Sequence, residues 1–230
     1  MLSIANIKAS ELRIAVTEYS PHVYVTNGQV KGPLIEYLKG VFGANYEKLT
    51  YVTMPNKRAM LELKKGTIDI MFPFEQKSSN ELTIGEPIFN SVPGICFKKT
   101  KFIPFLSAPG ALDNLNIGIS PTFPLVPIFN HSAVKITVIE GNDVLDRGIQ
   151  LLLRDRIDGF YHPSPINIYH FRNPLSKKIA CSLFYGYSKP IDLALSSRLS
   201  NEDIEKVQAL YINKMREKPY EYFLLDLRLN

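Results

Sequence analysis

Several polar and aromatic side chains follow short apolar segments, where a small molecule could be bound. Glu18 could hold a cation or an ammonium group, Tyr19 could stack on a ligand, and His22 could donate a hydrogen bond. Arg58 lies near the start of a predicted helix, and its planar guanidinium could bind a carboxylate or a phosphate with two hydrogen bonds. Surface exposure, loop packing or a local ion pair would explain the same residues without a ligand.

The second half of the chain contains two similar groups. Ser120 and Thr122 lie at a predicted strand-to-helix turn, where their hydroxyls and free backbone N–H groups could bind an anion or cap the helix. Tyr161 and His162 end a predicted strand and could contact the same ligand. A lone histidine such as His162 could also be structural, bonded to a backbone carbonyl.

No sequence motif for catalysis, nucleotide binding or metal binding is present. The chain lacks the phosphate-binding loop, the nucleophile elbow of hydrolases and the zinc-binding helix motif, and its four histidines show no metal spacing. The net charge of +5 comes from scattered lysines and arginines interspersed with acids, which is not typical of nucleic-acid binding. We therefore expect a non-enzymatic protein without cofactor, metal or nucleic-acid partner.

The two cysteines, Cys96 and Cys181, are too few for a metal motif or a disulfide-rich domain. They could form one disulfide in an oxidising compartment or remain two buried thiols. No apolar run is long enough to span a membrane. Residues 1–10 do not form a full signal peptide, so if the protein is exported, its signal is not part of this sequence.

The first third of the chain predicts a parallel sheet covered by helices. The predicted strands are 12–16, 49–53 and 68–72, and the predicted helices are 33–42 and 57–65. Apolar residues recur at helical spacing in both helices, and Gly66 is expected to cap the second. Pro73 is expected to end the third strand.

A second alternating series follows an extended apolar segment at residues 91–98. The predicted strands are 116–119, 134–139, 157–161, 179–183 and 191–196, and the predicted helices are 121–129, 144–154, 164–171 and 201–216. Asn201 is expected to cap the last helix. Ligands of such α/β folds bind at the carboxyl ends of strands, which is where the polar side chains described above occur.

A series of short motifs runs from about residue 11 to residue 218. LRIAV at 12–16 with YSPH at 19–22 begins the series, and GPLIEYL follows at 32–38. The others are PNKRA at 55–59, GTIDI at 66–70, EPIF at 86–89, IGI at 117–119, RIDG at 156–159 and SP at 164–165. In order and spacing they resemble the motifs of family 3 extracellular solute-binding proteins, the periplasmic binding proteins of ABC transporters.

This resemblance implies a two-lobed α/β fold of the type II periplasmic-binding-protein class, with two crossover strands at the hinge. The first lobe would comprise residues 11–98 plus 188–230, and the second lobe would comprise residues 99–187. A small solute would be captured in the cleft between the lobes, and hinge closure would follow. In this architecture Phe74 and Glu75, after the third strand, are also expected to line the site.

The chain departs from this family at both ends of the usual amino-acid site. Amino-acid binders usually carry an Arg after the third strand for the ligand carboxylate, but residues 76–81 contain none. Lys77 is a candidate replacement. The Asp that usually binds the ligand ammonium is replaced by Pro163, and Asn56 stands where the similar branch has Trp. We therefore expect a small polar solute other than an ordinary α-amino acid.

The resemblance predicts a monomeric, periplasmic solute-binding protein. Its partners would be a small-molecule ligand and the membrane permease of an ABC transporter. Two alternatives stay open on the same fold: a cyclic-carboxylate dehydratase-like enzyme, and the ligand-sensing domain of a membrane receptor. The enzyme would need a carboxylate such as Glu18 or Glu75 near Arg58 or His22.

Overall fold

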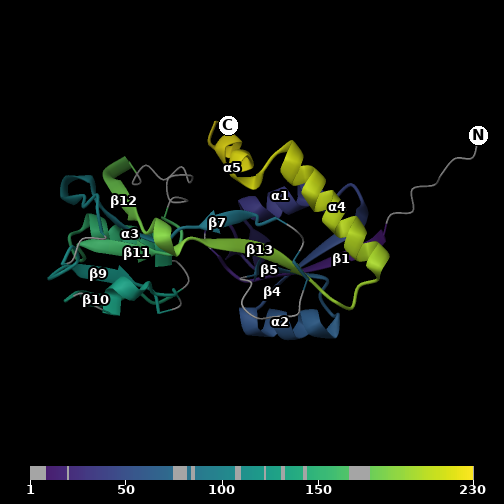
Figure 1. Ribbon diagram of the computed structural model, residues 1–230, viewed down its shortest axis with the longest axis horizontal. Coiled ribbons are helices and arrows are strands. Elements are labelled where there is room, and N and C mark those ends of the chain that lie inside the picture. The colour runs from purple at the N-terminus through teal and green to yellow at the C-terminus, as the bar shows by residue number, and fades with distance from the viewer. Residues whose placement is uncertain are drawn as a thin grey trace, which may run out of the picture. The chain divides into compact units, whose positions relative to one another are not determined.

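The described residues form two compact units (Figure 1). The computed structural model describes residues 9–19, 21–74, 82–83, 86–106, 110–121, 123–130, 133–141, 144–165 and 177–229. Unit 1 comprises Met1–Phe89 and Pro190–Asn230, and unit 2 comprises Asn90–Lys189. The chain therefore passes between the units twice, and unit 2 is one continuous segment inserted into unit 1.

Unit 1 is built around a mixed sheet with strand order β4-β1-β5-β13-β6, in which β7 also pairs with β13. These strands are β1 (Ala9–Val16), β4 (Tyr46–Thr53), β5 (Ile70–Phe74), β6 (Leu82–Thr83), β7 (Phe89–Ser91) and β13 (Lys189–Leu195). Strands β2 (Tyr24–Thr26) and β3 (Gln29–Lys31) form a separate two-stranded sheet. The helices are α1 (Pro33–Phe42), α2 (Asn56–Lys65), α4 (Asn201–Glu217) and α5 (Tyr220–Leu229).

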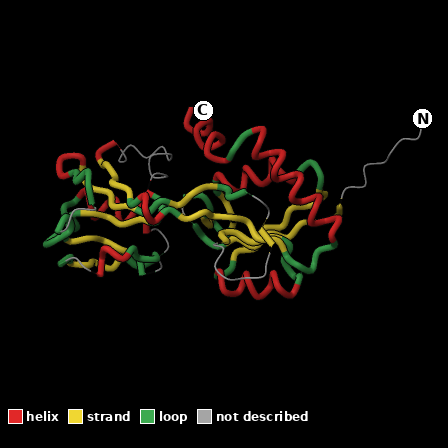
Figure 2. The backbone as a smooth tube through the Cα atoms, viewed as in Figure 1, coloured by secondary structure: helices red, strands yellow, loops and turns green. Residues whose placement is uncertain are grey.

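The side chains of β1 alternate between two cores on opposite faces of this sheet. Ile14 and Val16 enter a large core that α1, α4 and α5 complete, whereas Ala15 packs with Ala59 and Leu63 of α2. Figures 1 and 2 show α1 and α4 on one side of the sheet and α2 on the other. The sheet is thus covered on both faces, as its nearly continuous apolar strands require.

Unit 2 contains a five-stranded sheet with strand order β10-β9-β11-β8-β12. Its strands are β8 (Gly94–Lys98), β9 (Asn116–Ile119), β10 (Lys135–Val138), β11 (Gly159–His162) and β12 (Ile179–Leu183). Its helices are α3 (Val144–Leu153) and the short 3₁₀ helices η1 (Lys99–Lys101), η2 (Pro127–Asn130) and η5 (Tyr185–Tyr187). Along β11, Tyr161 points into one core and Phe160 into the other, beside α3.

A disulfide joins Cys96 of β8 to Cys181 of β12. The two residues face each other directly in the antiparallel register, with their α-carbons 3.9 Å apart. Of the two states that the sequence leaves open, the structure therefore has the bonded one. Within the described part of the chain, no helix is both long and apolar enough to cross a membrane.

Several predicted bounds agree with the structure. Helix α1 covers residues 33–42 as predicted, and Gly66 caps α2 in the left-handed conformation with φ 77°. The strand expected to end at Pro73 instead continues to Phe74. Pro73 is tolerated because β13 shifts register between Asp192 and Ala194, opposite the proline, and a proline without an N–H is accepted at such an irregularity.

Other predictions are wrong. The helix predicted at 121–129 is reduced to η2, and the cap of α4 is Ser200, whose Oγ accepts a hydrogen bond from the Asp203 N–H at 3.1 Å. The chain first passes from unit 1 to unit 2 after Phe89 rather than after Lys98. The reason is that β8 pairs with β11 and β12 inside the sheet of unit 2. The helix predicted at 164–171 lies largely outside the described residues.

Candidate functional site

In unit 1 the carboxyl ends of three parallel strands meet at one edge of the sheet. Val16 of β1 pairs with Thr53 of β4 on one side and with Phe72 of β5 on the other. The Thr17 N–H donates to the Phe72 carbonyl at 2.8 Å, which keeps the chain close to β5 for one residue beyond the strand. The next residues of β1 and the start of α2 therefore share this edge.

Glu18 and Tyr19 leave the sheet at this edge, and they differ in exposure. The side chain of Glu18 is exposed. Tyr19 is half-buried, and its ring lies 5.9 Å from the rings of His22 and Phe72 and 6.1 Å from that of Phe89. Tyr19 is thus fixed by packing on one side, which would limit the entropy lost if its remaining surface met a ligand.

His22 belongs to the core of unit 1. Its ring is buried, stacks on Phe89 with centroids 4.3 Å apart, and has Nδ1 2.8 Å from the Tyr220 hydroxyl. Burial raises the pKa of Tyr220 well above its ordinary value, so the hydroxyl stays protonated and can donate to Nδ1. The contacts of His22 described here hold the loop after β1 against α5.

Arg58 and Asn56 lie in the first turn of α2, which follows the end of β4. Pro55, the N-cap residue of this helix, makes no side-chain capping hydrogen bond, and Arg58 is exposed. Asn56 Nδ2 donates to the Pro73 carbonyl at 3.3 Å, which ties the start of α2 to β5. Among the described residues, no ion pair engages Arg58, so its guanidinium can meet an anion near the positive end of the α2 dipole.

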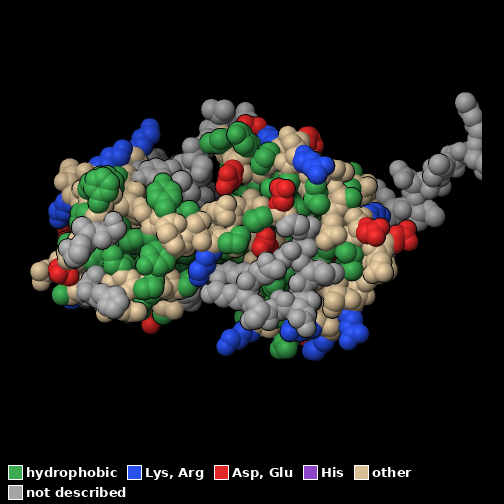
Figure 3. Space-filling model, viewed as in Figure 1, with side chains coloured by type: hydrophobic (Ala, Val, Ile, Leu, Met, Phe, Trp, Pro, Cys, Tyr) green, Lys and Arg blue, Asp and Glu red, His purple; other side chains and the backbone are tan. Residues whose placement is uncertain are grey.

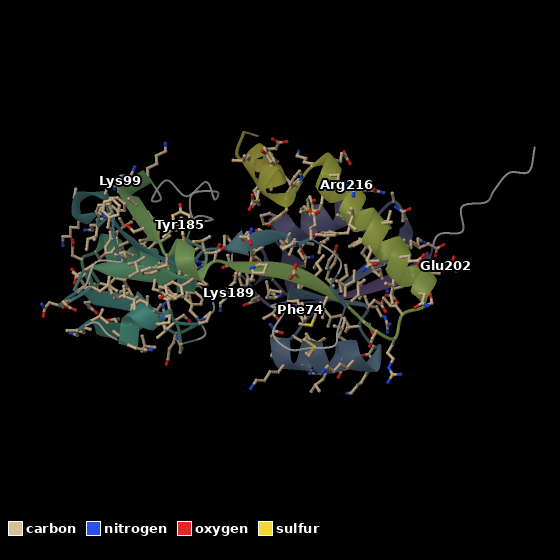
Figure 4. The ribbon with its side chains drawn as sticks, viewed as in Figure 1. Phe74, Lys99, Tyr185, Lys189, Glu202 and Arg216 are labelled. Carbon is tan, nitrogen blue, oxygen red and sulfur yellow. A yellow bond between two sulfur atoms is a disulfide. The ribbon has the colours of Figure 1, made fainter. Side chains whose placement is uncertain are left out.

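Phe74 is 2% exposed and packs with Ala59, Leu63 and Met71 in the core between β5 and α2 (Figure 4). A ligand could not contact its ring in this arrangement, so Phe74 is a core residue rather than part of the site surface. Glu75, Lys77 and Thr122 lie outside the described residues, and their expected roles stay predictions.

In unit 2 the carboxyl ends of β9, β10 and β11 also lie at one edge, since Val138 pairs with Ile119 and Phe160 pairs with Gly118. Ser120 follows β9, is buried, and accepts a hydrogen bond from the Phe123 N–H at 3.0 Å through its carbonyl. The backbone at Ser120 is therefore a tight turn rather than the start of the predicted helix.

Tyr161 is a structural residue of unit 2. Its hydroxyl donates to the Pro124 carbonyl at 2.7 Å, and its buried ring meets the Phe129 ring edge-on at 5.1 Å. Tyr161 thus holds the segment between β9 and β10 against the sheet. This role was not evident from the sequence, where its position at a strand end suggested ligand contact.

His162 is buried beside Phe123 and Phe160. Its Nδ1 accepts a hydrogen bond from the Ser164 N–H at 3.0 Å, which assigns the ring proton of the neutral form to Nε2. Burial lowers the pKa of His162 to about 4. His162 is therefore neutral at pH 7.

The structure thus brings Glu18, Tyr19 and Arg58 to one sheet edge and assigns packing roles to the other described aromatic candidates. The sequence analysis missed Thr17, whose Oγ1 donates to the Met54 carbonyl at 3.0 Å at the same edge. Its position one residue after a predicted strand was the available signal. In the described part of the chain, no three His, Cys, Asp or Glu side chains are grouped to hold a metal ion.

No family model and no curated protein matches this sequence. Solved structures do match its fold over almost the whole chain. An ancestral cationic amino acid solute binding protein, AncCDT-1, superposes with a TM-score of 0.75 at 16% identity, covering 94% of this chain and 95% of that chain. A second structure of AncCDT-1, with a TM-score of 0.67 and 17% identity, is described as the precursor of cyclohexadienyl dehydratase.

Two further structures are similar. The GluR0 ligand-binding core in complex with L-glutamate has a TM-score of 0.68 at 16% identity, covering 94% of this chain and 97% of that chain. The amino acid ABC transporter substrate-binding protein AbpA from Streptococcus pneumoniae, bound to L-arginine, has a TM-score of 0.65 at 14% identity, covering 95% and 94%. The chain therefore has the two-lobed α/β fold of periplasmic binding proteins, which confirms the predicted fold class.

Proposed function

We propose that this protein is an extracytoplasmic solute-binding protein that captures a small polar solute and delivers it to the membrane permease of an ABC transporter. The observation that carries the proposal is the fold shared with AncCDT-1 and AbpA over more than nine-tenths of both chains. The Cys96–Cys181 disulfide supports a place outside the cytoplasm, because such bonds persist in oxidising compartments.

Residues at the carboxyl ends of strands in each unit would hold the solute. In unit 1, Arg58 would bind an acidic group, Glu18 would accept hydrogen bonds from hydroxyls or a cation, and Tyr19 would stack on the solute. In unit 2, the hydroxyl of Thr122, two residues after the buried Ser120, would donate or accept a hydrogen bond. Glu75 and Lys77 follow β5 in sequence and belong to the same proposed set.

The solute would not be an ordinary α-amino acid. The family's ammonium-binding Asp is replaced by Pro163, whose carbonyl already accepts a hydrogen bond from Ser91 Oγ at 2.7 Å. Losing one partner of a buried charge pair costs about 2–5 kcal/mol, which is roughly 30- to 4000-fold in affinity. An organic acid or a cyclic or modified amino-acid derivative fits the remaining groups better.

Native mass spectrometry of the freshly purified protein, followed by a thermal-shift screen, tests this proposal. The screen would compare the twenty common amino acids with a panel of organic acids and cyclic derivatives. We expect a retained small molecule or a hit in the second panel, and a loss of at least tenfold in affinity for Arg58→Gln but not for its exposed neighbour Lys57→Gln. A sub-micromolar common amino acid would overturn the proposed ligand class. Equal effects of both substitutions would overturn the role of Arg58.

One comparison favours an enzyme as the second candidate. AncCDT-1 is described as a precursor of cyclohexadienyl dehydratase, so this fold is compatible with elimination chemistry on cyclic acids. Glu18 would then serve as the general acid or base. Incubation of the protein with cyclic carboxylates and mass-spectrometric analysis of the products separates the two functions, since a binding protein returns the ligand unchanged.

A further inference from the structure

The excess positive charge of the chain is confined to unit 2. Residues 90–189 contain 11 of the 27 lysines and arginines but only 6 of the 22 aspartates and glutamates. Unit 1 contains the other 16 of each sign and is formally neutral. The net charge of +5 therefore belongs to unit 2 alone, which the overall composition does not reveal.

Lysines gather at one end of the β8–β12 pair. Lys98 pairs with Ile179 in the register, so Lys177 and Lys178, which immediately precede β12, lie at the end of β8 where η1 begins. Lys99, Lys177 and Lys178 are all exposed, and no ion pair is formed by them among the described residues.

Asp155 is the carboxylate that pairs with Lys98 and Lys101, on either side of Lys99 in the sequence, and its charge is already neutralised. Asp155 lies 2.5 Å from Lys98 Nζ and 3.1 Å from Lys101 Nζ. Hydrogen bonds from these two ammonium groups lower the pKa of Asp155, so the carboxylate stays ionised and is shared by both lysines. Lys99, Lys177 and Lys178 are thus left to attract an external anion.

Exposed aromatic side chains lie close to β12 as well. Ser182 Oγ donates to the Ile103 carbonyl, which places residues 102–105 beside β12. Phe102 and Phe105 are 40% and 76% exposed, and Tyr185 and Tyr187 of η5 are 73% and 40% exposed. Figure 4 shows Lys99 and Tyr185 on unit 2, and Figure 3 shows hydrophobic side chains gathered on the visible face of that unit. We call this surface the basic–aromatic face: Lys99, Phe102, Phe105, Lys177, Lys178, Tyr185 and Tyr187.

We propose that the basic–aromatic face docks on the surface of an anionic lipid bilayer. Exposed phenylalanines gain nothing from a small soluble anion, but at a membrane interface they can enter the boundary between headgroups and acyl chains. Tyrosines favour the same depth, since their rings are apolar and their hydroxyls reach water. The flanking lysines would meet the lipid phosphates, and the charge of unit 2 would add long-range attraction. The inference does not depend on which solute the protein binds.

Sedimentation of the full chain with lipid vesicles tests the proposal. We expect binding to vesicles of 70% phosphatidylcholine and 30% phosphatidylglycerol at 50 mM salt, and at least tenfold weaker binding to pure phosphatidylcholine. The triple substitution Lys99→Gln, Lys177→Gln and Lys178→Gln should weaken binding about a hundredfold, at about fivefold per lysine. Phe105→Ser with Tyr185→Ser should also weaken it, and that loss should persist at 0.3 M salt, where charge effects are screened.

Matched variants on unit 1 distinguish binding through the basic–aromatic face from a general effect of net charge on vesicle binding. Lys31→Gln, Lys57→Gln and Lys64→Gln remove the same three charges from exposed positions, and Tyr222→Ser removes an aromatic side chain that is 63% exposed on α5. These variants should bind anionic vesicles as the unmodified protein does. Absence of vesicle binding, or equal losses in both sets of variants, would overturn the proposal. Unchanged melting temperatures for all variants would show that each has folded.

Discussion

Asp69 in unit 1 and Asp158 in unit 2 make the same hydrogen bond to a neighbouring parallel strand of their own sheet, β1 and β9 respectively. Asp69 Oδ2 accepts from the Arg13 N–H at 2.8 Å, and Asp158 Oδ2 accepts from the Asn116 N–H at 2.9 Å. In each case the aspartate N–H donates back to the carbonyl of the same partner, at 3.0 and 2.7 Å. The two motifs that contain these aspartates thus join neighbouring parallel strands and are structural.

Removing either aspartate should destabilise the protein. Asp69→Ala also removes two bonds from the Arg13 guanidinium, at 3.1 and 2.7 Å, so we expect a loss of about 2–3 kcal/mol in the free energy of unfolding. Asp158→Ala should cost about 1–2 kcal/mol. Urea unfolding measures both, and Glu202→Ala at an exposed position of α4 is the control. A loss no larger than that of the control would refute the structural role.

Tyr220→Phe should destabilise unit 1 by about 1–3 kcal/mol, because it leaves His22 Nδ1 buried without this donor while the ring packing is kept. Tyr222→Phe is the matched control, since that ring is 63% exposed and two residues away. Denaturant unfolding followed by tyrosine fluorescence checks the difference. Equal midpoints for the two variants would mean that the bond adds no stability.

The disulfide should stabilise unit 2. The bond closes a segment with a sequence separation of 85, and in the chain-entropy account such a closure contributes about 4–5 kcal/mol as an upper value. Cys96→Ala with Cys181→Ala should therefore lower the unfolding midpoint substantially. Differential scanning calorimetry of the oxidised protein, the reduced protein and the double variant measures this. Addition of reductant should leave the double variant unchanged.

Stability should fall as the pH drops from about 6.5 towards 4. His162 has a folded pKa of about 4, whereas an unfolded histidine titrates near 6.5, so the unfolded state takes up a proton that the folded state excludes. At pH 5 the loss relative to neutral pH should be about 2 kcal/mol. His162→Gln keeps an acceptor for the Ser164 N–H and should have a shallower pH dependence. Parallel profiles for the two proteins would disprove this.

The helices and strands were predictable where local pattern and packing agree. Helix α1 has a full apolar face and a proline in its first turn, and its bounds follow from the sequence. Helix α5 was missed because Pro219 separates it from α4, and its docking through Tyr220 depends on a distant ring, His22. The end of β5 was misplaced because only the register of β13 shows that Pro73 is tolerated.

The site was predictable only as a set of positions. Strand ends identify Glu18 and Arg58, which the structure leaves exposed, because parallel strands align their carboxyl ends. The same rule also selected Tyr161 and His22, whose polar atoms bond to Pro124 and Tyr220. Those partners lie 37 and 198 residues away, and no local sequence pattern reveals them.

The insertion of unit 2 into unit 1 has a consequence for synthesis of the chain. Strand β13 lies between β5 and β6, and α4 and α5 supply side chains to the large core of unit 1, yet all three begin at residue 189 or later. A chain made from its N-terminus therefore has all of unit 2 before unit 1 can close its sheet. At about 5–20 residues per second, the apolar strands of unit 1 would wait roughly 5–20 seconds for their last partners. Chaperones would have most reason to hold residues 9–74 during that interval, while the later-made unit folds first.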